Sequence, residues 1–79
     1  MDVLKTAILE MCRKRKDKSF CPSEVVRQLY PEDWRLFMEE VRESMMELYL
    51  QGKIRVSQKG IPIDPNQIPK GPLRISKPK

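Results

Sequence analysis

The sequence predicts an α+β fold that is mainly α-helical and closes with a small antiparallel β-hairpin. Up to residue 51, apolar residues recur at spacings of three and four, which is the period of amphipathic helices. After Gly52 the period changes to two, as expected for half-buried strands. The chain has 79 residues, so these elements should share one small core.

Three segments are expected to be helical, namely residues 2–15, 22–30 and 31–51. Pro22 suits the first position of the second helix, where no amide hydrogen is needed. Pro31 should end that helix, because the residue before a proline avoids helical geometry. Gly52 is a natural stop for the third helix. Trp34 falls on the apolar side of the third helix, which favours a role in the core over stacking on a base.

The hairpin is predicted from two alternating segments, residues 53–59 and 72–76. Their apolar residues fall on one face and their basic residues on the other. The intervening residues 60–71 contain three prolines and two glycines, which indicates a loop. Residues 19–21, placed just before Pro22, could form a further short strand.

The order is therefore helix, short strand, helix, helix and hairpin, which is the plan of a winged helix-turn-helix. The second and third helices would form the helix-turn-helix unit, with a turn at residues 30–33. We expect a single domain over residues 1–76, followed by a disordered tail at residues 77–79.

Four stretches in combination, FCPSEV, DWR, QKGIPIDP and GPLRIS, resemble a family of small bacterial proteins. That family is catalogued only as a domain of unknown function with a predicted winged-helix fold. The resemblance extends over roughly residues 4–76, so it implies the fold but no activity. The third helix departs from similar proteins, in which this helix is commonly richer in arginine and alanine. The positions that match the family pattern are Cys21, Pro22, Ser23, Glu24, Asp33, Trp34, Arg35, Gly60, Pro62, Asp64, Pro65 and Gly71.

The composition argues against an enzyme. The chain contains no histidine, the commonest general base near neutral pH, and only two cysteines, too few for a four-ligand zinc site. Cys21 precedes a helix start, where a thiol can become reactive, but without a base we interpret it as a small buried residue. We therefore expect no catalytic residue, no metal and no cofactor.

We expect no secretory signal in the first residues, because they lack a basic leader before the apolar stretch, and no apolar run is long enough to cross a membrane. We accordingly expect a soluble, cytoplasmic protein that has no membrane partner.

The net charge of +5 is unevenly distributed. Residues 1–30 contain seven basic and four acidic side chains, and residues 52–79 contain seven and one. By contrast, residues 31–51 contain two basic and six acidic side chains, for a net charge of −4. The segment that would read the major groove in a helix-turn-helix is thus the acidic one, and phosphates should repel it.

Two functional readings follow from this distribution. In the first, which we favour, the basic hairpin and the basic run at residues 13–18 contact the phosphates of DNA or RNA with low sequence specificity. The same hairpin charges could instead only protect an exposed sheet edge from pairing with other chains. The candidate contact residues are Lys14, Lys16, Lys53, Arg55, Lys59, Lys70 and Arg74.

The alternative is a protein-interaction module. Apolar residues rimmed by charge on the outer face of the third helix suit a protein partner or a second copy of the chain. The candidate residues on this face are Leu36, Glu39, Glu43, Met46 and Leu50.

Overall fold

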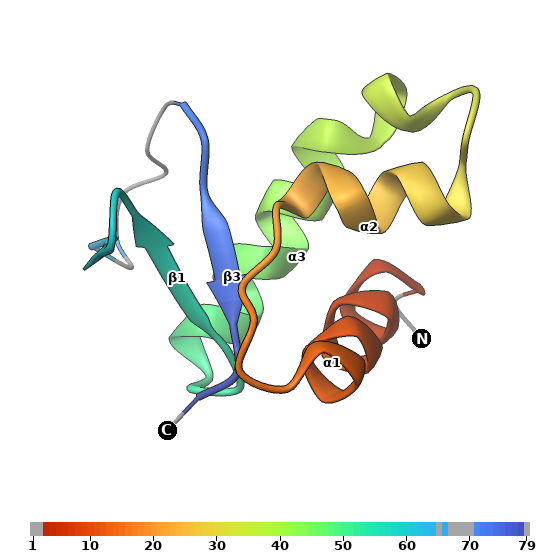
Figure 1. Cartoon of the computed structure of the whole chain (residues 1–79). Helices are drawn as coiled ribbons and strands as arrows, with labels where there is room; N and C mark the ends of the chain where they lie inside the picture. The colour runs from red at the N-terminus through yellow and green to blue at the C-terminus, as the bar shows by residue number, and fades with distance from the viewer. Residues whose placement is uncertain (1–2, 65, 67–70, 79) are drawn as a thin grey trace.

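The computed structural model describes residues 3–64, 66 and 71–78. Over these residues the chain forms three α-helices followed by a small three-stranded antiparallel sheet, which confirms the predicted α+β class (Figure 1). A short 3-10 helix, η1, precedes the third helix. The elements are α1 Val3–Arg15, α2 Pro22–Leu29, η1 Trp34–Phe37, α3 Met38–Leu50, β1 Arg55–Gln58, β2 Ile61–Pro62 and β3 Arg74–Ser76.

The core lies where α3 meets the other two helices and the inner face of the sheet. Every helix contributes to it, with Ile8, Val26 and Met45 each fully buried. Val56 of β1 and Ile75 of β3 close it from the sheet side. One continuous apolar cluster therefore holds both the helical and the β part of the chain together.

The sheet has the strand order β2-β1-β3. Arg55 pairs with Ser76, and Val56 pairs with Ile75. Phe20 adds a single bridge on the outer side of β3, because its N–H and C=O both bond to Ile75, at 2.9 and 2.7 Å. The short strand expected at residues 19–21 is thus present as one bridged residue.

Two ion pairs tie the helices to one another. Arg15, at the end of α1, lies 3.1 Å from Glu24 in the first turn of α2. Glu24 also accepts a hydrogen bond of 2.7 Å from the main-chain N–H of Cys21, which satisfies a donor at the start of the helix. Lys5 of α1 forms an ion pair with Glu47 of α3.

The third predicted helix, residues 31–51, is shorter than expected. Residues 31–33 form a turn, η1 follows, and the α-helix begins only at Met38. The rings of Tyr30 and Phe37 stack at 4.1 Å between centroids, so the chain packs back on itself here. Because Trp34 and Phe37 are three residues apart, they align on one side of a 3-10 helix as well as of an α-helix.

The expected loop at residues 60–71 contains one more strand than predicted. Ile61 and Pro62 form β2, which pairs with Gln58 and Ser57. A proline is compatible with this position because β2 lies at the edge of the sheet. The Tyr49 hydroxyl then donates a 2.8 Å hydrogen bond to the carbonyl of Ile63, which ties the chain after β2 to α3.

No helix in the described part of the chain is long and apolar enough to cross a membrane. Lys77 and Pro78, which we expect to lie in a disordered tail, have no regular secondary structure, and residue 79 lies outside the described residues. The disorder of this tail stays a prediction.

Candidate nucleic-acid interface

The outer face of the sheet presents polar and basic side chains. Side chains alternate between the two faces of a strand, and Val56 and Ile75 point into the core. Their neighbours therefore project outward, and the register places Arg55 opposite Ser76, and Arg74 opposite Ser57. The sequence prediction that Arg55 and Arg74 share an outward face agrees with this register.

A groove at one end of this face gathers basic residues from three separate segments. Its volume is about 420 Å³, and Lys16, Arg55 and Lys77 contribute to its wall. Among the described residues of the wall, Asp17 is the one acidic side chain, so their net charge is positive. We call this groove, defined by Lys16, Asp17, Arg55 and Lys77, the basic groove.

Local geometry explains how Lys16 reaches this position. It follows the last residue of α1 and adopts the left-handed conformation, with a φ of 53°. Its N–H still bonds to the carbonyl of Cys12 at 3.2 Å, as is common one residue beyond a helix end. The chain therefore turns sharply after Arg15, and Lys16 lies in the wall of the basic groove.

Lys77 is not among the residues predicted to contact nucleic acid, because it falls in the predicted tail at residues 77–79. Its place depends on the pairing of Arg55 with Ser76, which puts the following residue next to β1. Alternating hydrophobicity predicts the two strands but not their register, so no signal in the sequence locates Lys77.

The guanidinium of Arg74 already has partners within the protein, which the sequence does not indicate. Its Nε donates to Ser19 Oγ at 3.1 Å, its Nη2 to the Ser19 carbonyl at 2.9 Å, and its Nη1 to Cys21 Sγ at 3.3 Å. The side chain remains exposed, so a phosphate could still approach it. Its first role in the fold is nevertheless to hold β3 against the segment that precedes α2.

The remaining predicted contact residues are dispersed. Lys14, Lys53 and Lys59 are exposed but do not line the basic groove. Lys59 occupies the turn between β1 and β2 with a φ of 54°, roughly 13 Å along the strand from Arg55 at about 3.3 Å per residue. Lys70 lies outside the described residues.

Neighbouring carboxylates restrain two arginines of the basic run at residues 13–18. Arg13 bonds to Glu10 at 2.7 Å, and Arg15 is paired with Glu24. The hydrogen bond and the charge of Arg13 lower the pKa of Glu10. The two lysines named from this run, Lys14 and Lys16, are therefore its better candidates for an external contact.

A comparison with models of protein families identifies the family of this chain. The model of a family described as "Protein of unknown function (DUF3253)" matches residues 1–78. The chain belongs to this family. The match agrees with the resemblance to a family of unknown function, and it extends over both the basic groove and the third helix. No curated protein matches this DUF3253 chain.

The outer surface of α3 in this DUF3253 chain is acidic. Glu39, Glu40 and Glu43 are exposed, whereas Glu47 is engaged by Lys5. The side chains of Leu36 and Leu50, at the two ends of this surface, are 75% and 60% exposed. We call Leu36, Glu39, Glu43 and Leu50 the α3 surface.

The prediction that Met46 lies on the exposed face of the third helix is wrong. Only 6% of it is exposed, and it belongs to the core cluster. The buried arc of α3 is wider than the apolar periodicity suggests, because α1, α2 and β1 all pack against this helix. A residue on the flank of the arc is therefore covered.

Trp34 packs at the edge of the core of this DUF3253 chain and is partly exposed. The guanidinium carbons of Arg27 and Arg35 lie 4.2 and 4.8 Å from its ring centroid. Arg35 therefore stacks on the indole, and both arginines use Trp34 as a cation-π partner.

The two cysteines of this DUF3253 chain are free thiols in different surroundings. Cys12 is buried, and this burial raises the pKa of its thiol. Cys21 is half-buried at the start of α2, where Arg74 contacts its sulfur. Among the described residues, no cluster of three or more potential metal ligands is present.

Proposed function

We propose that this DUF3253 chain is a winged-helix module that binds nucleic acid through phosphate contacts, with little base specificity. The winged-helix assignment is supported by the order of the elements and by the bridge from Phe20 to β3, which joins the segment between α1 and α2 to the sheet.

The observation on which the proposal rests is the basic groove. Lys16, Arg55 and Lys77 come from a turn, a strand and a C-terminal segment, and all three line one hollow of the surface. Lysine and arginine side chains near a phosphate backbone release condensed counterions, which is the main source of non-specific affinity for nucleic acid. The acidic α3 surface would not enter the major groove, so the contact should depend on backbone geometry more than on base edges.

The proposal predicts a moderate salt dependence. Three phosphate contacts correspond to a slope of about −2.7 in a plot of log K against log salt. Between 50 and 200 mM salt, the affinity for duplex DNA should therefore fall about 40-fold. Fluorescence anisotropy with labelled duplexes of unrelated sequence, and with an RNA duplex of equal length, measures this slope.

Arg55→Glu tests whether the basic groove is the contact surface, and Arg35→Glu is its matched control. Both variants change the net charge by the same amount, but Arg35 lies in η1, at the end of the molecule away from the sheet (Figure 1). Arg55→Glu should weaken binding at least about tenfold and make the salt slope shallower. Equal losses in both variants would assign the effect to net charge alone, and no binding at low salt would exclude the function.

A second function, self-association through the α3 surface, is supported by the exposure of Leu36 and Leu50. Large exposed apolar side chains rimmed by charge are typical of protein contacts. Sedimentation equilibrium over a range of concentrations should then show a mass that rises above the monomer. Leu36→Lys with Leu50→Lys should abolish this rise, whereas Leu9→Lys, at another exposed leucine, should not. A constant monomer mass for the unmodified chain would rule this function out.

A further inference from the structure

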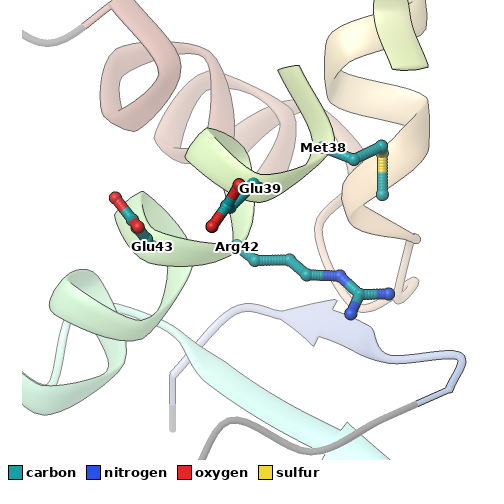
Figure 2. A pocket seen from close by; sticks show the side chains of 4 residues that line it. All are labelled: Met38, Glu39, Arg42 and Glu43. Atoms are coloured by element: carbon teal, nitrogen blue, oxygen red, sulfur yellow. The ribbon is translucent and has the colours of Figure 1, made fainter. Parts of the chain in front are cut away.

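The side chain of Arg42 in α3 has an unsatisfied buried donor. Its Nε is buried and has no hydrogen-bond partner among the described residues, and no ion pair joins it to any of their carboxylates. Glu39 and Glu43 stand close by on the same helix. Figure 2 shows that the Arg42 side chain nevertheless extends away from both carboxylates. Buried donors in proteins are almost always bonded, so a guanidinium whose charge has no partner among the described residues is an exception.

The same side chain contributes to the wall of a pocket. The pocket lies between the start of α2, the first turns of α3 and the segment that leads into β3, and its volume is about 360 Å³. This volume falls within the range of about 300–1,000 Å³ that is usual for sites of small organic ligands. Around Arg42 the wall is mostly apolar, with Cys21, Pro22, Met38, Pro72 and Leu73 among its residues.

We propose that this pocket binds a small monocarboxylic acid with a compact apolar body. The carboxylate would accept parallel hydrogen bonds from the two Nη groups of Arg42, a paired geometry in which a guanidinium holds a carboxylate, because Nε itself is covered by protein atoms. The apolar body would lie against Met38 and Leu73. A single guanidinium in an apolar wall matches one negative charge next to an apolar group.

A phosphate group fits this pocket less well. It has up to two charges and more acceptor oxygens than one guanidinium can satisfy. Arg42 also borders a second hollow, whose wall includes Glu39 and Glu43, and these carboxylates would repel a dianion. The pocket is thus distinct in chemistry and in position from the basic groove, and a ligand here would not depend on nucleic-acid binding.

Nitrogen-15 and carbon-13 NMR of the full chain test the proposal, because the Nε–H group of Arg42 and the methyl group of Met38 each give a signal of their own. The probe is 3-phenylpropionate, and its neutral amide is the control ligand of nearly the same shape. We expect saturable shifts of the Arg42 Nε–H and Met38 methyl signals with the acid, at a dissociation constant of about 1 mM or below. The amide and inorganic phosphate should each bind at least about tenfold more weakly.

Arg42→Gln should weaken the binding of 3-phenylpropionate at least about tenfold, whereas Arg35→Gln, at an exposed arginine outside the pocket, should bind it as the unmodified chain does. Equal shifts with the acid and the amide, stronger shifts with phosphate, or no saturable shift at all would overturn the proposal. If Arg42→Gln does not fold, the comparison of acid and amide on the unmodified chain decides the question by itself.

Discussion

Arg74 and Ser19 are joined by two hydrogen bonds across a sequence separation of 55 residues. The guanidinium of Arg74 donates to both the side-chain and the main-chain oxygen of Ser19. Next to this contact, Phe20 forms its bridge to Ile75. The pair therefore fastens the last strand to the segment between α1 and α2, and it joins the helical and β parts of the fold.

Arg74→Gln should destabilise the chain by about 1–2 kcal/mol. The variant removes charge-assisted hydrogen bonds and leaves the Ser19 carbonyl without its partner, although exposure to water limits the loss. Urea denaturation followed by circular dichroism measures the change. Arg55→Gln, on the same outer face of the sheet, should change the free energy of unfolding by less than about 0.5 kcal/mol. Equal effects of the two substitutions would show that the contact with Ser19 does not stabilise the fold.

Phe20→Ala should be the more damaging change in the same region, with a loss of about 3–5 kcal/mol. Phe20 is fully buried, and it is one of the largest such side chains in the described part of the molecule. A small domain typically has a free energy of unfolding of only a few kcal/mol, so this variant should be largely unfolded. Loss of dispersion in the amide NMR spectrum is the readout. Leu29→Ala, at a partly exposed leucine of α2, is the control and should retain a folded spectrum.

The sequence predicts much of this architecture because several boundaries depend on single residues. Pro22 begins α2, and Gly52 follows α3 with a φ of 74°, a conformation that glycine adopts at little cost. The start of α3 was wrong by seven residues, because apolar spacing does not separate a 3-10 segment from an α-helix. β2 was missed because Gly60 and Pro62 are residues typical of loops.

The candidate site was less predictable than the fold. Charge patterning indicated Lys16 and Arg55, but their proximity depends on a left-handed turn after α1 and on strand register. The burial of Met46 depends on how many elements pack around α3. The pocket next to Arg42 combines α2, α3 and the segment before β3, which no local pattern brings together.

The two thiols should react at very different rates. Cys21 is half-buried and should be modified by a water-soluble disulfide reagent in the native state, whereas Cys12 is only 6% exposed and should react upon unfolding. Mass spectrometry after partial labelling distinguishes the two sites. Labelling of Cys12 as fast as Cys21 under native conditions would contradict the burial of Cys12 in the core.

The raised pKa of Cys12 also gives the stability a pH dependence. Burial disfavours the thiolate, so the native state keeps the proton to a higher pH than the unfolded chain does. The contribution of the neutral thiol is thus complete below the ordinary thiol pKa of about 8.5 and is lost as the pH rises through the raised value. The stability difference between the unmodified chain and Cys12→Ala, measured by urea denaturation, should therefore shrink above about pH 8.5. A difference that does not change between pH 7 and pH 10 would contradict this cause.

Gly52→Ala should destabilise the chain by about 1–2 kcal/mol for reasons of backbone conformation alone. The φ of 74° is left-handed, and a methyl group added at this position would meet no atom of the described residues within 4 Å, apart from its chain neighbours. The cost should therefore come from the backbone conformation that an alanine must adopt, and steric clash should contribute nothing. Gln51→Ala is the neighbouring control, because Gln51 has helical backbone angles and is exposed. Thermal denaturation should show a lower midpoint for Gly52→Ala. The midpoint of Gln51→Ala should be almost unchanged. A Gly52→Ala midpoint equal to that of the unmodified chain would mean that the residues after α3 can adopt another conformation without loss, and the entry into β1 would then not depend on this glycine.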